Sequence, residues 1–270
     1  MLKMLKKIDL NILKFQPVEN PNSFSNGGSF TYNYLLGLVM LYMTLAVLSG
    51  LNVHKLVLIG PFLLPAGIFT APFTYCLSNV ITEVYGFPVA RNMMWWFVIC
   101  STIFTGLSFL LIHLPSPIEF THQDAFNLIL GSMPRVYIAG IVGTIVGINI
   151  NNYYVSKLKI KMEGRHYWFR SLISTCGGEV IYNVIAYPIM MLWHVSLSSL
   201  LHIFISVTVF KIFTTSLFLL PECLLARYLK FKEKIDVFDY NVNYNLFNFK
   251  LHGVPYKPKL ALVNNRSADE

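Results

Sequence analysis

The stretch of residues 200–225 reads LLHIFISVTVFKIFTTSLFLLPECLL and is apolar over almost its whole length. The hydrocarbon core of a bilayer is about 30 Å thick, and a helix that rises about 1.5 Å per residue crosses it in about 20 residues. This stretch is therefore long enough to form a transmembrane helix.

Five further runs of comparable length and composition precede it along the chain. They cover about residues 34–53, 65–84, 92–114, 134–155 and 168–193. Residues 56–64 are also apolar, but they are too short to cross and contain a proline, so we predict a hairpin segment that leads into the second span. The sequence thus predicts an all-α polytopic membrane protein with six transmembrane helices.

The composition of the whole chain supports this fold class. Of the 270 residues, 55% are hydrophobic and only 13% are charged, whereas a soluble domain carries roughly a quarter charged residues. This excludes an ordinary water-soluble globule. The four cysteines lie singly in apolar runs, without the close pairing of a disulfide framework or a zinc site.

The basic residues are concentrated in particular segments. The chain has 21 Lys and Arg against 13 Asp and Glu, a net charge of +8, which in a soluble protein would suggest a nucleic-acid partner. In this chain the basic residues lie mainly before the first span, after the second, between the fourth and fifth, and after the sixth. Because short cytoplasmic loops retain positive charge, we expect both termini in the cytoplasm and no direct nucleic-acid partner.

The chain divides into three predicted segments. Residues 1–31 form a cytoplasmic N-terminal segment, in which the alternation of Leu, Ile and Lys is compatible with an amphipathic helix at the membrane interface. Residues 32–230 form the six-helix transmembrane domain. Residues 231–270 form a cytoplasmic tail that is too polar to span the membrane.

Two charges within the apolar runs are the first candidates for function, because a charged side chain at the bilayer centre costs several kcal/mol. Glu179 lies about 16 Å into the fifth span, and Lys211 lies equally deep in the sixth span from the opposite face. Both are therefore expected near the midplane. They could form a structural ion pair between the two helices or part of a substrate or proton site.

Helical spacing adds further polar residues to this candidate site. Thr175 and Asn183 lie four residues either side of Glu179 and share its face. The second span carries another stripe, with spacings of three, four and four residues, that consists of Pro72, Tyr75, Asn79 and Glu83.

Several residues near the span ends have two open interpretations. Glu83 could pair with Arg91 or Arg170, or it could contact a ligand. Arg135, at the outer end of the fourth span, could guard an entrance or reach the lipid headgroups, and Asn152, near the inner end, could line a cavity. The same span favours close helix packing through its small residues, Gly140, Gly143 and Gly147.

Several kinds of chemistry are not supported. The sequence has no Gly-rich phosphate loop ending in Lys-Ser or Lys-Thr, no His-Glu-x-x-His zinc motif and no Gly-x-Ser-x-Gly nucleophile turn. We therefore expect no enzyme activity, no cofactor and no metal site. A helical bundle with a polar interior remains, and such a bundle suits the passage or capture of a polar solute.

Short blocks at these positions carry a resemblance to a known family. They include PFTY at 72–75, ITEVYG at 81–86, MPR at 133–135, SKLK at 156–159, GE at 178–179 and FK at 210–211, followed by Lys230, Asp236 and Asp239. Over about residues 35–249 the chain resembles the queuosine precursor transporter family, six-helix proteins of the bacterial inner membrane that are also grouped with vitamin uptake transporters. Asn79 and Asn183 stand where many members carry Asp.

The resemblance implies a function and a substrate. Members of this family import 7-deazaguanine bases, such as 7-cyano-7-deazaguanine, 7-aminomethyl-7-deazaguanine or queuine, for salvage into tRNA. The partners implied are a nucleobase-like small molecule and the lipid bilayer; a homo-oligomer stays open. The alternative functions are a substrate-capturing subunit of a multi-component uptake system and a structural or signalling membrane protein.

A guanine-like edge presents adjacent N–H donors, which one carboxylate can accept in pairs. Glu179 is the first choice for that carboxylate and Glu83 the second, while Lys211 could contact the carbonyl oxygen of the base. An aromatic ring from Tyr75 or Tyr182 could stack on it. The predicted substrate-binding residues are Glu179, Lys211, Asn79, Glu83, Asn183, Tyr75 and Thr175, and the predicted gating or structural residues are Arg91, Arg135, Arg170 and Asn152.

Overall fold

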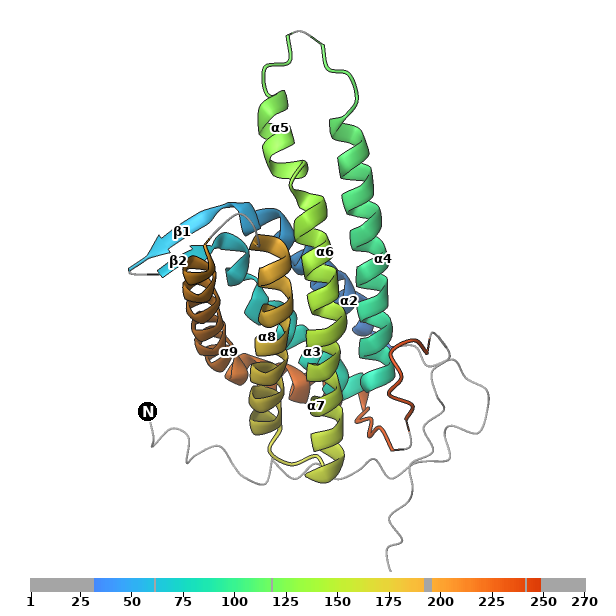
Figure 1. Ribbon diagram of the computed structural model, residues 1–270. Coiled ribbons are helices and arrows are strands. Elements are labelled where there is room, and N and C mark those ends of the chain that lie inside the picture. The colour runs from blue at the N-terminus through green and yellow to red at the C-terminus, as the bar shows by residue number, and fades with distance from the viewer. Residues whose placement is uncertain (1–31, 61, 118, 192–195, 241, 249–270) are drawn as a thin grey trace, which may run out of the picture. The chain divides into compact units, whose positions relative to one another are not determined.

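A computed structural model describes residues 32–60, 62–117, 119–191, 196–240 and 242–248. Their secondary structure is almost entirely helical, as predicted. The α-helices are α2 (Leu35–Leu51), α3 (Ala71–Tyr85), α4 (Phe87–Ile112), α5 (Gln123–Leu130), α6 (Met133–Gly143), α7 (Asn149–Lys161), α8 (Tyr167–Met191) and α9 (Leu197–Glu233) (Figure 1). The amphipathic helix predicted near the N-terminus lies outside the described residues.

The predicted hairpin segment is confirmed as a small β-hairpin. Strands β1 (Leu56–Ile59) and β2 (Phe62–Pro65) pair antiparallel, with Leu56 opposite Pro65 and Ile59 opposite Phe62. The 3₁₀ turns η3 (Asn52–His54) and η4 (Ala66–Phe69) join this hairpin to α2 and α3. The second predicted span therefore begins as strand and 3₁₀ turn and becomes α-helix only at Ala71.

The long helices have the length and composition of membrane helices. Within the described residues, three helical runs are long and apolar enough to cross a bilayer: Phe87–Ile112, Gln123–Lys161 and Leu197–Glu233. Helix α2 is a shorter apolar helix. Large hydrophobic side chains such as Leu107, Leu110 and Leu220 are exposed on their outer faces, as expected for contact with lipid. The count of six spans and the cytoplasmic termini stay predictions.

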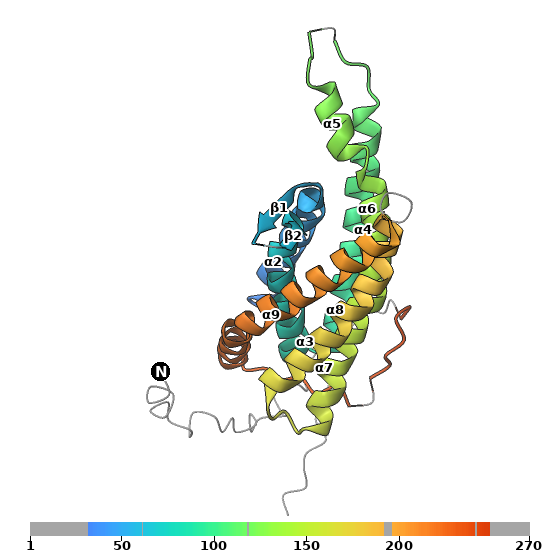
Figure 2. The ribbon, with the colours of Figure 1, turned by 60° about the vertical axis from the view of Figure 1, so that its left-hand side comes forward.

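Helix α3 is the central helix of the bundle. Every residue in it except Phe73 is buried. It packs against α2, α4, α7 and α9, and α8 lies between α9 and the continuous run of α6, η5 and α7 (Figures 1 and 2). Residues placed on α3, α7 and α8 are therefore brought into one shared interior.

Close packing through glycine, predicted for the fourth span, is confirmed where that span meets α8. The span contains a π-helical segment, η5 (Thr144–Ile148), between α6 and α7. A Cβ atom added at Gly147 would lie 2.8 Å from the carbonyl oxygen of Gly178, and one at Gly178 would lie 2.7 Å from Cβ of Asn151. Only glycine permits the two backbones to approach this closely.

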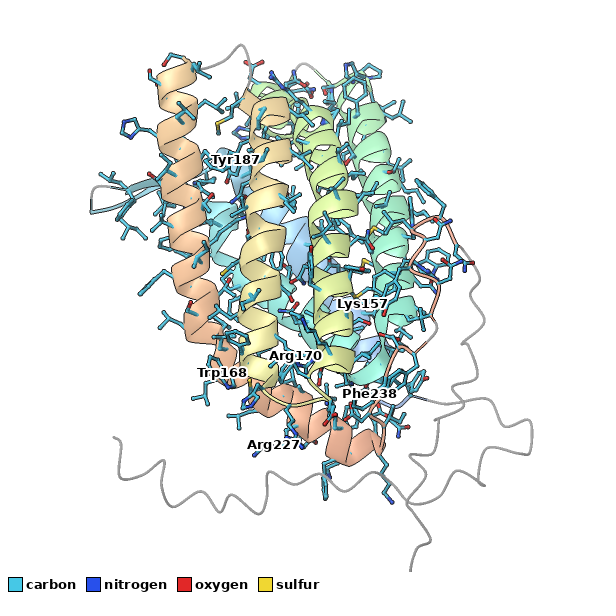
Figure 3. All side chains as sticks on the ribbon, turned by 60° about the horizontal axis from the view of Figure 1, so that its bottom comes forward. Lys157, Trp168, Arg170, Tyr187, Arg227 and Phe238 are labelled. Atoms are coloured by element: carbon cyan, nitrogen blue, oxygen red, sulfur yellow. The ribbon has the colours of Figure 1, made fainter. Side chains whose placement is uncertain are left out.

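The two ends of the bundle are formed by different segments, and we call them the hairpin end and the tail end. The hairpin end carries β1 and β2, together with the end of α2 and the start of α3. At the tail end, residues 235–240 and 242–248 pack beside the end of α3 and the start of α4. The final turns of α9, which follow Pro221 and include Arg227, run across this end of the bundle (Figure 3).

Candidate functional site

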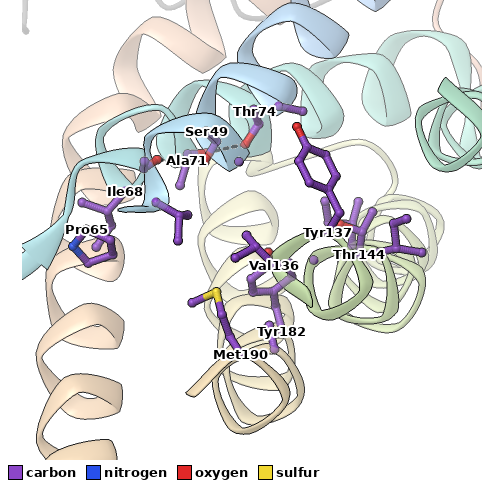
Figure 4. Close-up of a pocket in the computed structure, with 18 of the residues that line it drawn as sticks. Ser49, Pro65, Ile68, Ala71, Thr74, Val136, Tyr137, Thr144, Tyr182 and Met190 are labelled. Carbon is purple, nitrogen blue, oxygen red and sulfur yellow. Dashed lines mark hydrogen bonds between the residues drawn. The ribbon is translucent and has the colours of Figure 1, made fainter. Parts of the chain in front are cut away.

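A cavity of about 120 Å³ opens in the half of the bundle nearer the hairpin end. It lies between α2, η4, α3, α6, η5 and α8 (Figure 4). Much of its lining is aromatic: Tyr42, Tyr75, Phe97, Tyr137, Tyr182 and Tyr187. Such walls suit a flat aromatic ligand, because ring faces stack and phenolic hydroxyls offer polar contacts.

One of these hydroxyls lacks a hydrogen-bond partner. The Tyr75 side chain is buried, and its hydroxyl oxygen makes no hydrogen bond within the part of the chain that the structure describes. Buried polar groups in folded proteins are nearly always paired. Tyr75 lines the cavity, so a polar ligand atom in the cavity could satisfy this hydroxyl.

Lys211 reaches the cavity from α9 and pairs with Glu179 of α8. The Lys211 Nζ lies 2.8 Å from Oε2 of Glu179, and both side chains are buried. Lys211 also donates to Oδ1 of Asn183 at 3.1 Å and lies 4.7 Å from the ring centroid of Tyr182. The structure therefore brings together Glu179, Lys211 and Asn183, whereas Thr175, predicted on the same face of α8, accepts a hydrogen bond from Asn79 instead. Oε1 of Glu179 accepts no hydrogen bond among the described residues.

A network of uncharged polar groups lies between α3, α7 and α8. Asn79 donates to the hydroxyls of Ser171 at 3.0 Å and Thr175 at 2.8 Å, and its Oδ1 accepts from Asn151 at 2.6 Å. Asn151 also donates to Asn152 at 3.2 Å. Asn79, Thr175 and Asn152 are thus paired with one another or with neighbours inside the protein rather than pointing into the cavity.

Glu83 lies at the tail end in a cluster of ion pairs. Arg170 donates to its two carboxylate oxygens at 2.9 and 3.0 Å, and Lys230 donates at 2.6 Å. Lys159 donates to the Glu83 carbonyl oxygen at 2.5 Å and to Asp236 at 2.5 Å, while Lys230 lies 2.8 Å from Asp236. Of the two interpretations of Glu83, the structure shows the ion pair, and the partner is Arg170 together with two lysines.

The C-terminal segment closes this end of the bundle. Arg91 donates to the carbonyl oxygens of Asn243 at 2.9 Å and Asn245 at 3.0 Å. Asp239 accepts from the Phe87 backbone N–H at 2.9 Å and from the Ser156 hydroxyl at 2.5 Å. Burial raises the pKa of Asp239 above its usual value. Arg91 therefore holds the tail, which corrects the expectation that it could pair with Glu83.

A family model described as "Putative vitamin uptake transporter" matches residues 65–226. The chain belongs to this vitamin uptake transporter family. The matched region contains the cavity-lining part of α3, the Glu179–Lys211 pair and Glu83. No curated protein and no solved structure matches the chain.

At the hairpin end of this transporter, Arg135 lies in the first turn of α6, beside the end of α8. Its Nε donates to the carbonyl oxygen of Ile189 at 3.0 Å. Val136 and Tyr137, which follow Arg135, line the cavity. The structure thus places Arg135 next to the cavity, where it holds the end of α8.

Sequence reasoning missed a third buried carboxylate in this transporter, Glu222 of α9. Its side chain is 1% exposed and accepts hydrogen bonds from Ser171 at 2.5 Å and Tyr167 at 2.7 Å. A charge inside an apolar run was the available signal, the same one that identified Lys211. It was obscured because Glu222 lies near the end of the run.

Lys159, Lys230 and Asp236 were also missed as parts of one cluster. Hydropathy assigns all three to segments outside the membrane, where charges are expected to be solvated. They fall within the blocks that carry the family resemblance, and that was the signal that could have found them. Their contact with Glu83 depends on how the tail folds back, which spacing does not reveal.

Proposed function

We propose that this transporter imports a 7-deazaguanine base, a precursor of queuosine, across the bacterial inner membrane for salvage into tRNA. In this proposal six helices span the membrane and both termini are cytoplasmic. The observation that supports it best is the aromatic cavity with Lys211 in its lining and Glu179 paired to that lysine.

The chemistry of the cavity matches the chemistry of such a base. A deazaguanine is flat and aromatic, so it can stack against Tyr75 or Tyr182. Its adjacent N–H groups can donate to the Glu179 carboxylate, and its carbonyl oxygen can accept from Lys211. A base with a different edge would leave these buried groups unpaired, and that penalty gives selectivity.

The two ends of the bundle suggest how the base would move. Under the proposed topology the hairpin end faces outward, so the cavity lies in the outer half, while the Glu83 cluster and the tail close the inner half. Alternating access requires that the inner half opens when the outer half closes. Opening would separate Glu83 from its cationic partners or displace the tail.

The test measures uptake in a bacterial host that cannot synthesise queuosine precursors. We expect radiolabelled 7-cyano-7-deazaguanine to enter, and queuosine to appear in tRNA, only when the transporter is expressed. If membrane-inserted protein leaves both unchanged, the substrate assignment is wrong. Uptake that requires coexpressed ATPase subunits would instead assign the chain as the capturing subunit of a multi-component system.

A further inference from the structure

Glu222 differs from the other buried glutamates in its surroundings. Glu83 is paired with Arg170, Lys230 and Lys159, and Glu179 is paired with Lys211. Glu222 is equally buried, but within the described residues no Lys, Arg or His lies within ion-pair distance of it. Its carboxylate accepts hydrogen bonds from the hydroxyls of Ser171 and Tyr167 and faces the side-chain amide of Asn79.

An unpaired carboxylate is costly in an apolar interior, and a proton removes that cost. From this geometry we infer that Glu222 is a proton-binding site that couples substrate import to the proton gradient. The inference rests on the proposed transport function, because a coupling site needs a transported substrate. The proton arrives from one side of the membrane and binds a carboxylate oxygen of Glu222. It then leaves that oxygen and is released to the other side.

The groups that face Glu222 do not supply a neutralising cation. Helix α8 contributes Tyr167 and Ser171, and α3 contributes Asn79, Cys76 and Glu83, while Cys223 is its neighbour on α9. None of these is cationic. Arg170, next to Ser171 on α8, is held by both oxygens of Glu83 and is therefore committed elsewhere.

A series of hydrogen bonds runs from Glu222 to Thr175, on the same helix as Glu179. Ser171 donates to Glu222 and accepts from Asn79, and Asn79 also donates to Thr175. Thr175 lies one helical turn before Glu179 on α8. Binding or release of a proton at Glu222 can therefore be transmitted along α8 toward the carboxylate that would receive the base.

The protonation state of Glu222 determines the direction of the hydrogen bonds in the series from Glu222 to Thr175. An ionised carboxylate only accepts hydrogen bonds, whereas a protonated one also donates. When Glu222 is protonated, its hydroxyl can donate to Ser171, so that the Ser171 hydroxyl must turn toward another acceptor. Such a reversal changes the contact between α3, α8 and α9, the helices that would have to move relative to one another during transport.

The experiment compares exchange with accumulation, using the full-length transporter reconstituted in liposomes and radiolabelled 7-cyano-7-deazaguanine. Exchange between internal and external base needs no gradient, whereas accumulation needs an energy source. The wild type should exchange the base, accumulate it when the lumen is more alkaline than the medium, and acidify a lumen that contains a pH-sensitive dye. Glu222→Gln, which is permanently neutral, should retain exchange but lose both accumulation and acidification.

The controls separate coupling from folding. Glu163→Gln, in which the replaced side chain is 78% exposed, should accumulate base like the wild type. If Glu222→Gln also loses exchange, Glu222→Asp decides, because it keeps a titratable group: restored accumulation supports the inference, and continued loss in correctly inserted protein overturns it.

Other outcomes contradict the inference directly. If accumulation by the wild type does not depend on the proton gradient, or depends on a sodium gradient instead, the assignment of Glu222 is overturned and the proposed transport function is unaffected. Proton-driven accumulation by Glu222→Gln does the same. Failure of the wild type to exchange the base at all would overturn the proposed substrate, and the coupling inference with it.

Discussion

Arg170 holds Glu83 through two parallel hydrogen bonds of 2.9 and 3.0 Å, between side chains that have no exposed surface. This pair joins the end of α3 to the start of α8. Two lysines and the tail carboxylate Asp236 surround it. Its two hydrogen bonds and its complete burial make it a strong electrostatic link at the tail end.

Arg170→Gln should destabilise the protein strongly. Removing one member of a buried ion pair costs about 3–5 kcal/mol when the remaining charge has no other partner. Because Lys230 and Lys159 still face Glu83, we expect a cost near the lower end of that range. We expect a large loss of thermal stability in the detergent-solubilised protein, measured by its unfolding midpoint. The matched control is Arg165→Gln, since Arg165 forms an exposed pair with Glu163 at 3.9 Å, and exposed pairs contribute about 0–1 kcal/mol. Equal midpoints for the two variants would contradict this account of Arg170.

Asp236→Asn should loosen the tail. Asp236 accepts from Lys159 and lies 2.8 Å from Lys230, so removal of its charge leaves the two lysines with less compensation. We expect faster proteolytic cleavage within residues 235–248 while the helices stay intact. Asp124→Asn, at an exposed position in the first turn of α5, serves as the control. Unchanged cleavage in Asp236→Asn would show that the contacts of Asp239 and Arg91 hold the tail without Asp236.

Gly178→Ala should separate α8 from the fourth predicted span. The added Cβ would meet Cβ of Asn151 at 2.7 Å and the Gly147 carbonyl oxygen at 2.9 Å, and overpacking of this kind costs about 1–3 kcal/mol. Gly177→Ala is the neighbouring control, because nothing lies within 4 Å of its Cβ position. That control should be neutral or slightly stabilising, since Ala favours helix over Gly. The unfolding midpoints distinguish the two, and equal effects would refute the close approach.

Tyr75→Phe should affect binding more than stability. The Tyr75 hydroxyl is buried without a partner among the described residues, and removal of an unpaired buried polar group is close to neutral. If the hydroxyl contacts the base, the variant should keep its unfolding midpoint and bind 7-cyano-7-deazaguanine more weakly. Unchanged affinity would remove Tyr75 from the substrate site.

The sequence predicts the helical fold and the Glu179–Lys211 contact because both follow from simple constraints. Long apolar runs must be helical in a bilayer, and two opposite charges at equal depth on consecutive helices gain by pairing. Helical spacing also predicts that Asn183 lies beside the pair, whereas Thr175, predicted on the same face, accepts from Asn79 instead. These predictions need no knowledge of how distant segments pack.

The tail end could not be predicted in this way. The charges of Lys159, Lys230 and Asp236 are typical of solvated loops, and the burial of these residues depends on residues 235–240 and 242–248 folding back against α3 and α4. The sequence alone does not decide whether Arg91 or Arg170 pairs with Glu83, because both arginines are predicted near the same membrane face as Glu83. Only the packing of α8 against α3 decides that Arg170 reaches the carboxylate.

The most direct test of the central claim is the binding of 7-cyano-7-deazaguanine to purified protein carrying Glu179→Gln, with Glu163→Gln as the matched control. Glu179 retains one carboxylate oxygen without a partner among the described residues, beside the cavity that Lys211 lines. We predict that Glu179→Gln loses measurable binding by isothermal titration, while Glu163→Gln binds like the wild type. Wild-type affinity in correctly folded Glu179→Gln protein would contradict the assignment of Glu179 as the carboxylate that recognises the base.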